Sequence, residues 1–69
     1  MVRGTYMVRD TMGDELVVQT YEDTTAVYVE MYDGHAETVN LLAEMKLTPS
    51  TAREFAKKLM MAADKADTR

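Results

Sequence analysis

The first two-thirds of the chain alternate between apolar and polar positions with a period of two residues, the pattern of half-buried β-strands. This pattern covers residues 3–9, 15–21, 25–32 and 38–47. The last third changes to a period of about 3.6 residues and predicts an amphipathic helix over residues 49–66. We therefore predict a single β-β-β-β-α domain over residues 1–69, of the α+β class. A four-stranded antiparallel meander is followed by one C-terminal helix.

Loop lengths fix which strand residues face each other, because a slip of one residue would send an apolar set to the wrong face. An even second loop places Val18 opposite Val29. An odd first loop places Arg9 opposite Glu15, which is a favourable pair of opposite charges. A three-residue third loop over residues 33–35 then brings the last strand onto the same apolar face.

One face of this sheet is predicted to be apolar and to form the core with the helix. Its residues are Tyr6, Val8, Leu16, Val18, Val27, Val29, Met31, Val39, Leu41, Ala43, Met45 and Leu47. Thr48 is a good N-cap for the helix, and Pro49 stands at the first helical position, where a missing N–H is harmless. Phe55 and Leu59 lead an apolar stripe along the helix. We expect this stripe to pack on the apolar sheet face.

The opposite face of the sheet carries too many large side chains for a purely solvated surface. Tyrosines are enriched where one end of the ring is buried and the other is wet, as at protein interfaces. On the helix, one methionine points away from the apolar stripe, among charged residues. The candidate interface residues are therefore Met7, Val17, Tyr21, Tyr28, Tyr32, Leu42 and Met61. The alternative interpretation is ordinary β-propensity on an exposed face.

Length and composition indicate how such a fold is stabilised. A domain of 69 residues buries only about 60% of the surface that its unfolded chain exposes. Cysteine is absent, which removes disulfides and thiolate metal sites. Self-association is the remaining way to stabilise a small scaffold, so we expect a homo-oligomer, with a dimer favoured.

Charge and residue spacing exclude several classes of function. A net charge of −4 does not supply the basic surface that binding to a phosphate backbone needs. No residues have a catalytic, metal-binding or cofactor-binding spacing, and His35 has no partner that the sequence identifies. We therefore predict no catalytic, cofactor or metal site and no enzyme activity. Apolar runs are too short to cross a membrane and no targeting segment is evident, so we expect a cytoplasmic protein.

The end of the chain resembles a group of known proteins. Its strand continues into Leu-Thr-Pro at residues 47–49, and the helix closes on Ala-Ala-Asp at residues 62–64. This is similar to the end of many small uncharacterised proteins of actinobacteria and their phages. Ser50 and Thr51 depart from the pattern, because that family often has Glu or Gln there. The resemblance covers about the last third of the chain and implies an actinobacterial or actinobacteriophage origin, but no activity.

Together these patterns favour a small non-enzymatic protein-interaction module that is homo-oligomeric and binds another protein. For a phage product, that partner would be a host protein whose activity it modulates. The alternative is a PC4-like single-stranded nucleic-acid-binding protein, which the order of strands and helix resembles. Tyr21, Tyr28 and Tyr32 would then stack on bases. The platform of that family is basic, so the acidic balance of this chain weighs against the alternative.

Overall fold

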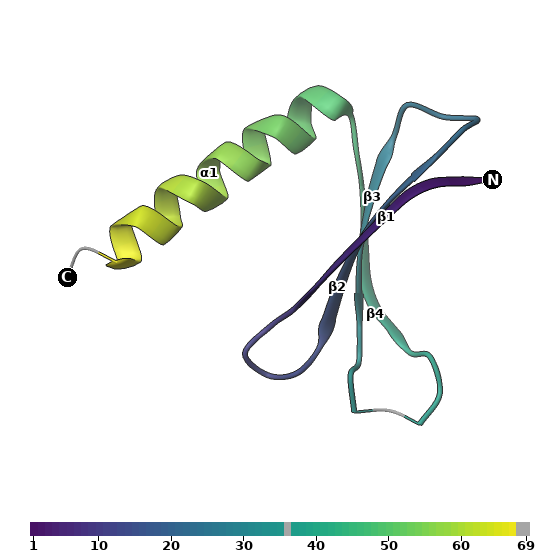
Figure 1. The fold of residues 1–69 in the computed structure, drawn as a ribbon, viewed down its shortest axis with the longest axis horizontal. Helices are drawn as coiled ribbons and strands as arrows, with labels where there is room; N and C mark the ends of the chain where they lie inside the picture. Colours follow the sequence, from purple (N-terminus) through teal and green to yellow (C-terminus); the bar gives the residue numbers. More distant parts are fainter. Residues whose placement is uncertain (36, 68–69) are drawn as a thin grey trace.

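Four antiparallel strands in one sheet and a C-terminal helix form the chain in the computed structural model, which describes residues 1–35 and 37–67 (Figure 1). The elements are β1 (Val2–Arg9), β2 (Glu15–Tyr21), β3 (Val27–Tyr32), β4 (Leu41–Leu47) and α1 (Pro49–Asp67). The strands lie in the order β1-β2-β3-β4, so each is hydrogen-bonded to the next strand along the chain. The predicted α+β class and the antiparallel meander followed by a helix are confirmed.

The predicted register of the first three strands is also confirmed. Val18 lies opposite Val29, and Arg9 lies opposite Glu15. The Arg9 guanidinium donates a 2.8 Å hydrogen bond to the Glu15 carboxylate. Gly13 in the first turn has a φ of 89°, in the left-handed region that glycine adopts without strain. The odd or even lengths of the loops and the residue types in the turns were therefore sufficient to predict how these three strands align.

The fourth strand is shorter than predicted and pairs differently. It begins at Leu41 instead of residue 38, so Val39 lies outside the strand and is 88% exposed. Val29 pairs with Met45, where a three-residue loop over residues 33–35 predicted Val39. The partner of Val29 on the fourth strand is thus an even number of residues further along the chain than predicted. From Ala43 to Leu47 the same side of β4 therefore still faces the apolar side of the sheet. The prediction is wrong for Leu41, because a register shift between Met31 and Tyr32 pairs Leu41 with Tyr32 of the opposite face.

The loop between β3 and β4 is longer because it docks on the turn between β1 and β2. His35 Nε2 donates a 2.7 Å hydrogen bond to the Met12 carbonyl. The Gly34 N–H donates a 3.2 Å hydrogen bond to Asp14 Oδ1. A Cβ atom at Gly34 would collide with the Gly13 carbonyl, so the two loops approach this closely only with glycine at that position.

The helix begins at the predicted residue but does not cover the sheet. The Thr51 N–H donates a 3.1 Å hydrogen bond to Thr48 Oγ1, and the Ala52 N–H donates a 2.9 Å bond to the Thr48 carbonyl. Thr48 is therefore the N-cap. From this point α1 runs away from the sheet, and its contacts with the strands are concentrated on β4 (Figure 1). The predicted packing of the helix on one sheet face is not seen, and none of the residues of α1 is buried.

A one-residue connection explains this geometry. Only Thr48 separates β4 from α1, and one residue spans at most about 3.6 Å. A helix is about 10–12 Å across with its side chains. Its axis cannot rise above the sheet and turn back over it within the reach of one residue.

The predicted core face of the sheet is therefore open. Among the described residues no hydrophobic side chain is buried; Tyr6 is 66% exposed and Val8 is 61% exposed. We call this face the inner face. Its strand residues are Tyr6, Val8, Leu16, Val18, Val27, Val29, Met31, Ala43, Met45 and Leu47. Residues 1–35 and 37–67 by themselves form a sheet and a helix without a buried apolar core.

Candidate functional site

The outer face of the sheet, opposite the inner face, contains most of the predicted interface residues. Alternation and register place on it Thr5, Met7, Arg9, Glu15, Val17, Gln19, Tyr21, Tyr28, Glu30, Tyr32, Glu44 and Lys46. It combines tyrosine rings, a few aliphatic side chains and charges of both signs. Its centre is organised by one carboxylate.

Glu30 is that carboxylate, and it is 8% exposed, the one buried residue in the part of the chain that the structure describes. Its Oε1 atom accepts hydrogen bonds from Gln19 Nε2 and from the Tyr32 hydroxyl, both at 3.0 Å. The Tyr21 hydroxyl donates to Gln19 Oε1 at 3.2 Å and extends the chain of bonds. Removing a carboxylate from water is unfavourable unless donors replace the water. Here neutral side chains do so, and the network fixes two tyrosine rings in place.

A second aromatic group lies beside this network. The Tyr21 and Tyr28 rings meet edge to face, with centroids 5.3 Å apart and an interplanar angle of 79°. Lys46 Nζ lies 5.9 Å from the centroid of the Tyr28 ring, within the range of a cation–π contact. Residues from β2, β3 and β4 thus form one continuous polar and aromatic surface.

The same network perturbs the titration of Tyr32. Its hydrogen bond to Glu30 raises the pKa of the Tyr32 phenol above its ordinary value, and burial and the charges of Glu30 and Glu44 act in the same direction. Each of these causes favours the neutral phenol, which can donate a hydrogen bond, over the phenolate. A raised folded-state pKa means that the stabilisation is fully present below pH about 10, the ordinary tyrosine value. It is lost as the pH rises through the folded-state pKa.

Glu30→Gln should therefore lower the pKa of Tyr32, because it removes the charge that opposes ionisation. Titration of tyrosine absorbance or of the Tyr32 ring signals by NMR measures this shift. Glu22→Gln, which removes a carboxylate from the exposed turn after β2, is the matched control and should leave the Tyr32 titration unchanged. Equal Tyr32 midpoints in the natural chain and in Glu30→Gln would show that the carboxylate does not control the phenol.

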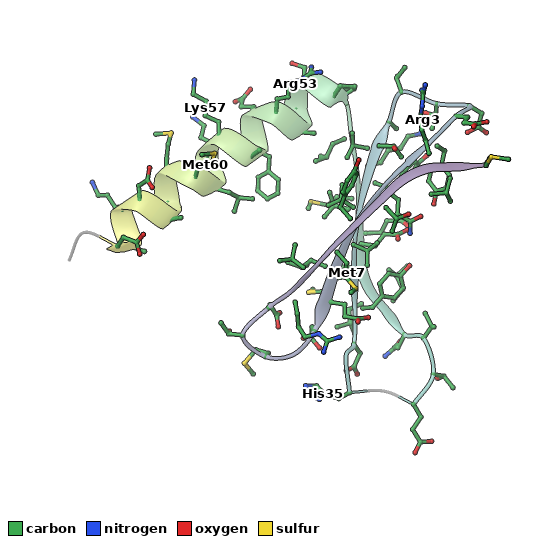
Figure 2. The ribbon with its side chains drawn as sticks, viewed as in Figure 1. Arg3, Met7, His35, Arg53, Lys57 and Met60 are labelled. Carbon is green, nitrogen blue, oxygen red and sulfur yellow. The ribbon has the colours of Figure 1, made fainter. Side chains whose placement is uncertain are left out.

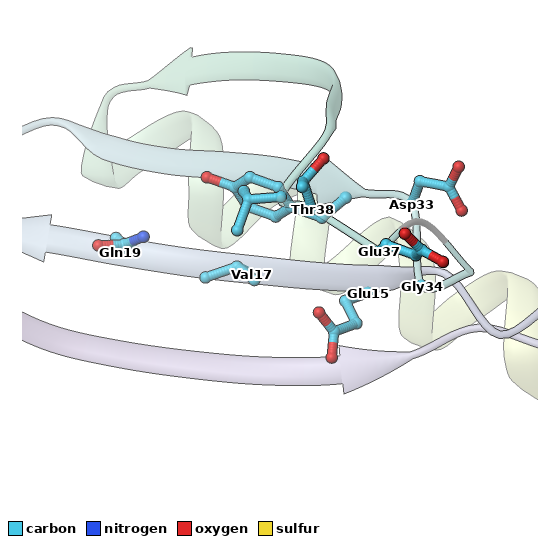
Figure 3. A pocket seen from close by; sticks show the side chains of 9 residues that line it. Glu15, Val17, Gln19, Asp33, Gly34, Glu37 and Thr38 are labelled. Carbon is cyan, nitrogen blue, oxygen red and sulfur yellow. The ribbon is translucent and has the colours of Figure 1, made fainter.

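A hollow of about 440 Å³ opens at the end of the outer face beside the loop between β3 and β4 (Figure 3). Glu15, Val17 and Gln19 of β2 line one side, and Asp33 and Glu37 belong to the loop side. The lining is acidic and suits a cationic or hydrogen-bond-donating group of a partner. Among the described residues, no group of histidine, aspartate and glutamate side chains is arranged to hold a metal ion.

No family model, curated protein or solved structure matches this chain. Its function therefore has to be inferred from its own residues and geometry. The α1 helix of the described chain is not long and apolar enough to cross a membrane.

The sequence-predicted interface residues separate into two groups. The outer face brings together Met7, Val17, Tyr21, Tyr28 and Tyr32, with Met7 directly opposite Val17 in the register. Leu42 of β4 lies where the pairing of β3 with β4 shifts, and it is 48% exposed. Met61 lies on α1, which leaves the sheet, and it is 56% exposed. The structure gives Met61 no place in the outer-face cluster.

Sequence reasoning missed the polar members of this surface. Gln19, Glu30 and Lys46 share this face with the tyrosines but are not among the predicted interface residues. One available signal was the position of Glu30 two residues from both Tyr28 and Tyr32 on a central strand, since residues at this spacing share a face. Its burial depends on the rings of its neighbours, which alternation does not specify.

Proposed function

We propose that the protein is a non-enzymatic protein-interaction module that works as a homo-oligomer, in its simplest form a dimer. One observation carries this proposal: the chain exposes 5763 Å² of surface, whereas a folded monomer of its 7.8 kDa mass exposes about 4,400 Å². Its radius of gyration is 13.7 Å, compared with about 11 Å for a compact domain of this length. A chain this open needs a partner to complete its core.

The excess surface matches what a stable dimer buries. About 1,400 Å² per chain amounts to about 2,800 Å² for a pair, which lies within the range of roughly 2,000–5,000 Å² typical of obligate interfaces. The inner face and the apolar stripe of α1 are the surfaces that such an interface would cover. This supports self-association through the inner face.

The outer face suits a different partner. Its tyrosines, its satisfied carboxylate and its mixed charges resemble the composition of a non-obligate protein interface, which is more polar than a dimer core. The Glu30 carboxylate is held by neutral donors, which suits a rigid binding surface better than a general base. We propose that this face binds another protein. If the chain has the bacterial or phage origin that its helix suggests, that protein is a host protein.

The charges of the outer face weigh against the single-stranded nucleic-acid alternative. Glu15, Glu30 and Glu44 follow three adjacent strands across it. Of the basic side chains on this face, Arg9 is already paired with Glu15 and Lys46 lies against Tyr28. The face therefore lacks the excess of unpaired basic side chains that binding to a phosphate backbone needs.

Tyr28→Ala should abolish binding of the natural partner while leaving the dimer intact. Tyr6→Ala, the same change on the inner face, is the matched control and should weaken the dimer instead. Partner binding is measured by quantitative mass spectrometry of proteins co-purified from the host with each variant, and self-association by sedimentation. If Tyr28→Ala dissociates the dimer, or if both variants retain every co-purified protein, the proposed separation of the two faces is wrong.

A further inference from the structure

The helix α1 presents an apolar stripe that its own chain leaves uncovered. Arg53 and Lys57 project from the side of α1 that faces away from the sheet (Figure 2). At about 100° per residue, Phe55 and Leu59 lie on the opposite side of the helix. Phe55 is 42% exposed and Leu59 is 55% exposed. The stripe therefore turns toward the sheet side of the helix, where both side chains stay substantially exposed.

The inner face offers a complementary surface. Tyr6, Val18, Val29 and Met45 form one row across all four strands, each directly opposite the next. The parallel row consists of Val8, Leu16, Met31 and Ala43. Ala43 is the smallest side chain in these rows, and a shallow recess of about 110 Å³ includes it in its lining. A recess of this kind accepts an anchoring side chain, the usual arrangement at the centre of an interface.

The two surfaces cannot meet within one chain in the geometry observed. The single residue Thr48 connects β4 to α1, and its hydrogen bonds to the first helical turn fix the direction of the helix. Short connections of this kind favour exchange of an element between identical chains over folding back. The helix α1 has 19 residues and is roughly 28 Å long. A seven-residue strand such as β4, which rises about 3.4 Å per residue, has a comparable length.

We propose that α1 of one copy packs on the inner face of a second copy, and that the second copy returns the same contact. The inference rests on the self-association proposed above and specifies its geometry. In this helix-exchanged dimer, Phe55 enters the recess beside Ala43 of the other chain and Leu59 packs along the neighbouring apolar row. The contact is isologous, so one two-fold axis covers both helices and both sheets. It uses the surface that the single chain exposes beyond that of a compact domain.

Chemical cross-linking between single-cysteine chains tests this geometry, because the natural chain contains no cysteine. A tagged Ala43→Cys chain is unfolded and refolded together with an untagged Ala56→Cys chain, then treated with a short bis-maleimide. Ala56 lies beside Phe55 on the stripe. Met61→Cys, on the other side of α1, replaces Ala56→Cys in the matched control. We expect at least tenfold more tagged–untagged cross-linked dimer with Ala56→Cys than with Met61→Cys.

Two other outcomes would overturn the exchange. Efficient linkage within single chains of the double variant Ala43→Cys/Ala56→Cys, with none between chains, would show that the helix folds back on its own sheet. Linkage of Ala56→Cys mainly to itself would show that the helices pair with each other. Sedimentation of the same samples separates these outcomes from failure of self-association, in which every sample has the mass of one chain.

Isotope-filtered NMR of the unsubstituted protein gives the same test without any variant. Phe55 is the only phenylalanine in the chain, so its ring signals need no deconvolution. In a mixture of labelled and unlabelled chains refolded together, the ring of Phe55 should show cross-peaks to Leu16 and Met31 of the other chain. Cross-peaks to these residues found only within one chain would contradict the proposal.

Discussion

Replacing Leu59 by aspartate is expected to dissociate the dimer, whereas the same replacement at Met61 leaves it assembled. The two side chains are equally exposed in the single chain, at 55% and 56%. They lie on the same helix, two residues apart, and so on different faces of it. A monomer would therefore tolerate both changes alike. The helix-exchanged dimer would not, because only Leu59 contacts the inner face of the other copy.

The expected effect is large because the contact occurs twice. Burying a leucine side chain contributes about 2 kcal/mol, and a carboxylate placed on an apolar surface without a partner adds an unfavourable desolvation term. Two symmetric sites therefore lose at least about 4 kcal/mol, which weakens association roughly a thousandfold. The Leu59→Asp chain should sediment as a monomer at concentrations where the Met61→Asp chain remains a dimer. Equal dissociation constants for the two variants would contradict the assignment of the stripe.

The second large effect is a dependence of thermal stability on chain concentration. If the folded chain has no core of its own, folding and association form one equilibrium. Each tenfold increase in concentration then stabilises the folded dimer by about 1.4 kcal/mol. The unfolding entropy is about 2.1 cal/mol/K per residue, counted over both chains of the dimer. Each tenfold increase in chain concentration therefore raises the midpoint temperature of thermal unfolding by roughly 5 °C.

Circular dichroism melts over a hundredfold range of concentration measure this effect, and the expected shift is about 10 °C. Met61→Asp should show the same shift as the natural chain and serves as the control. Leu59→Asp should show weak, broad unfolding, because its isolated chains lack a packed interior. A sharp transition at one temperature across the whole range would indicate that the single chain folds without a second copy.

Much of the fold follows from short-range patterns in the sequence. The pairing of Val18 with Val29 follows from the parity of one loop, because a shift by one residue would expose an apolar set. The start of the helix follows from Thr48 and Pro49, whose preferences for the N-cap and first helical positions are local. These features depend only on neighbouring residues or on alternation.

The remaining features depend on information that alternation does not carry. A shift of the fourth strand by an even number of residues keeps the same side chains on the inner face, so the pattern cannot choose between Val39 and Met45 as the partner of Val29. Similarly, an apolar stripe shows that α1 needs an apolar surface, but not whether its own sheet or that of another copy supplies it. The one-residue connection at Thr48 favours the sheet of another copy in the proposed dimer.

Only part of the outer face could be predicted, because alternation gives the side of the sheet on which a residue lies but not its side-chain contacts. Tyr21, Tyr28 and Tyr32 were identified from their size and their side of the sheet. The burial of Glu30 could not be predicted, because it depends on how the side chains of Gln19 and Tyr32 turn toward it across the register. Polar residues between aromatic neighbours on a central strand are thus candidates for an ordered network.

Sedimentation equilibrium of the unmodified chain decides whether it completes its core with a second copy. At micromolar concentration the chain should have twice its 7.8 kDa mass, and on dilution it should dissociate and lose its secondary structure together. A mass of one chain at every concentration, with the sheet and helix retained, would contradict the dimer.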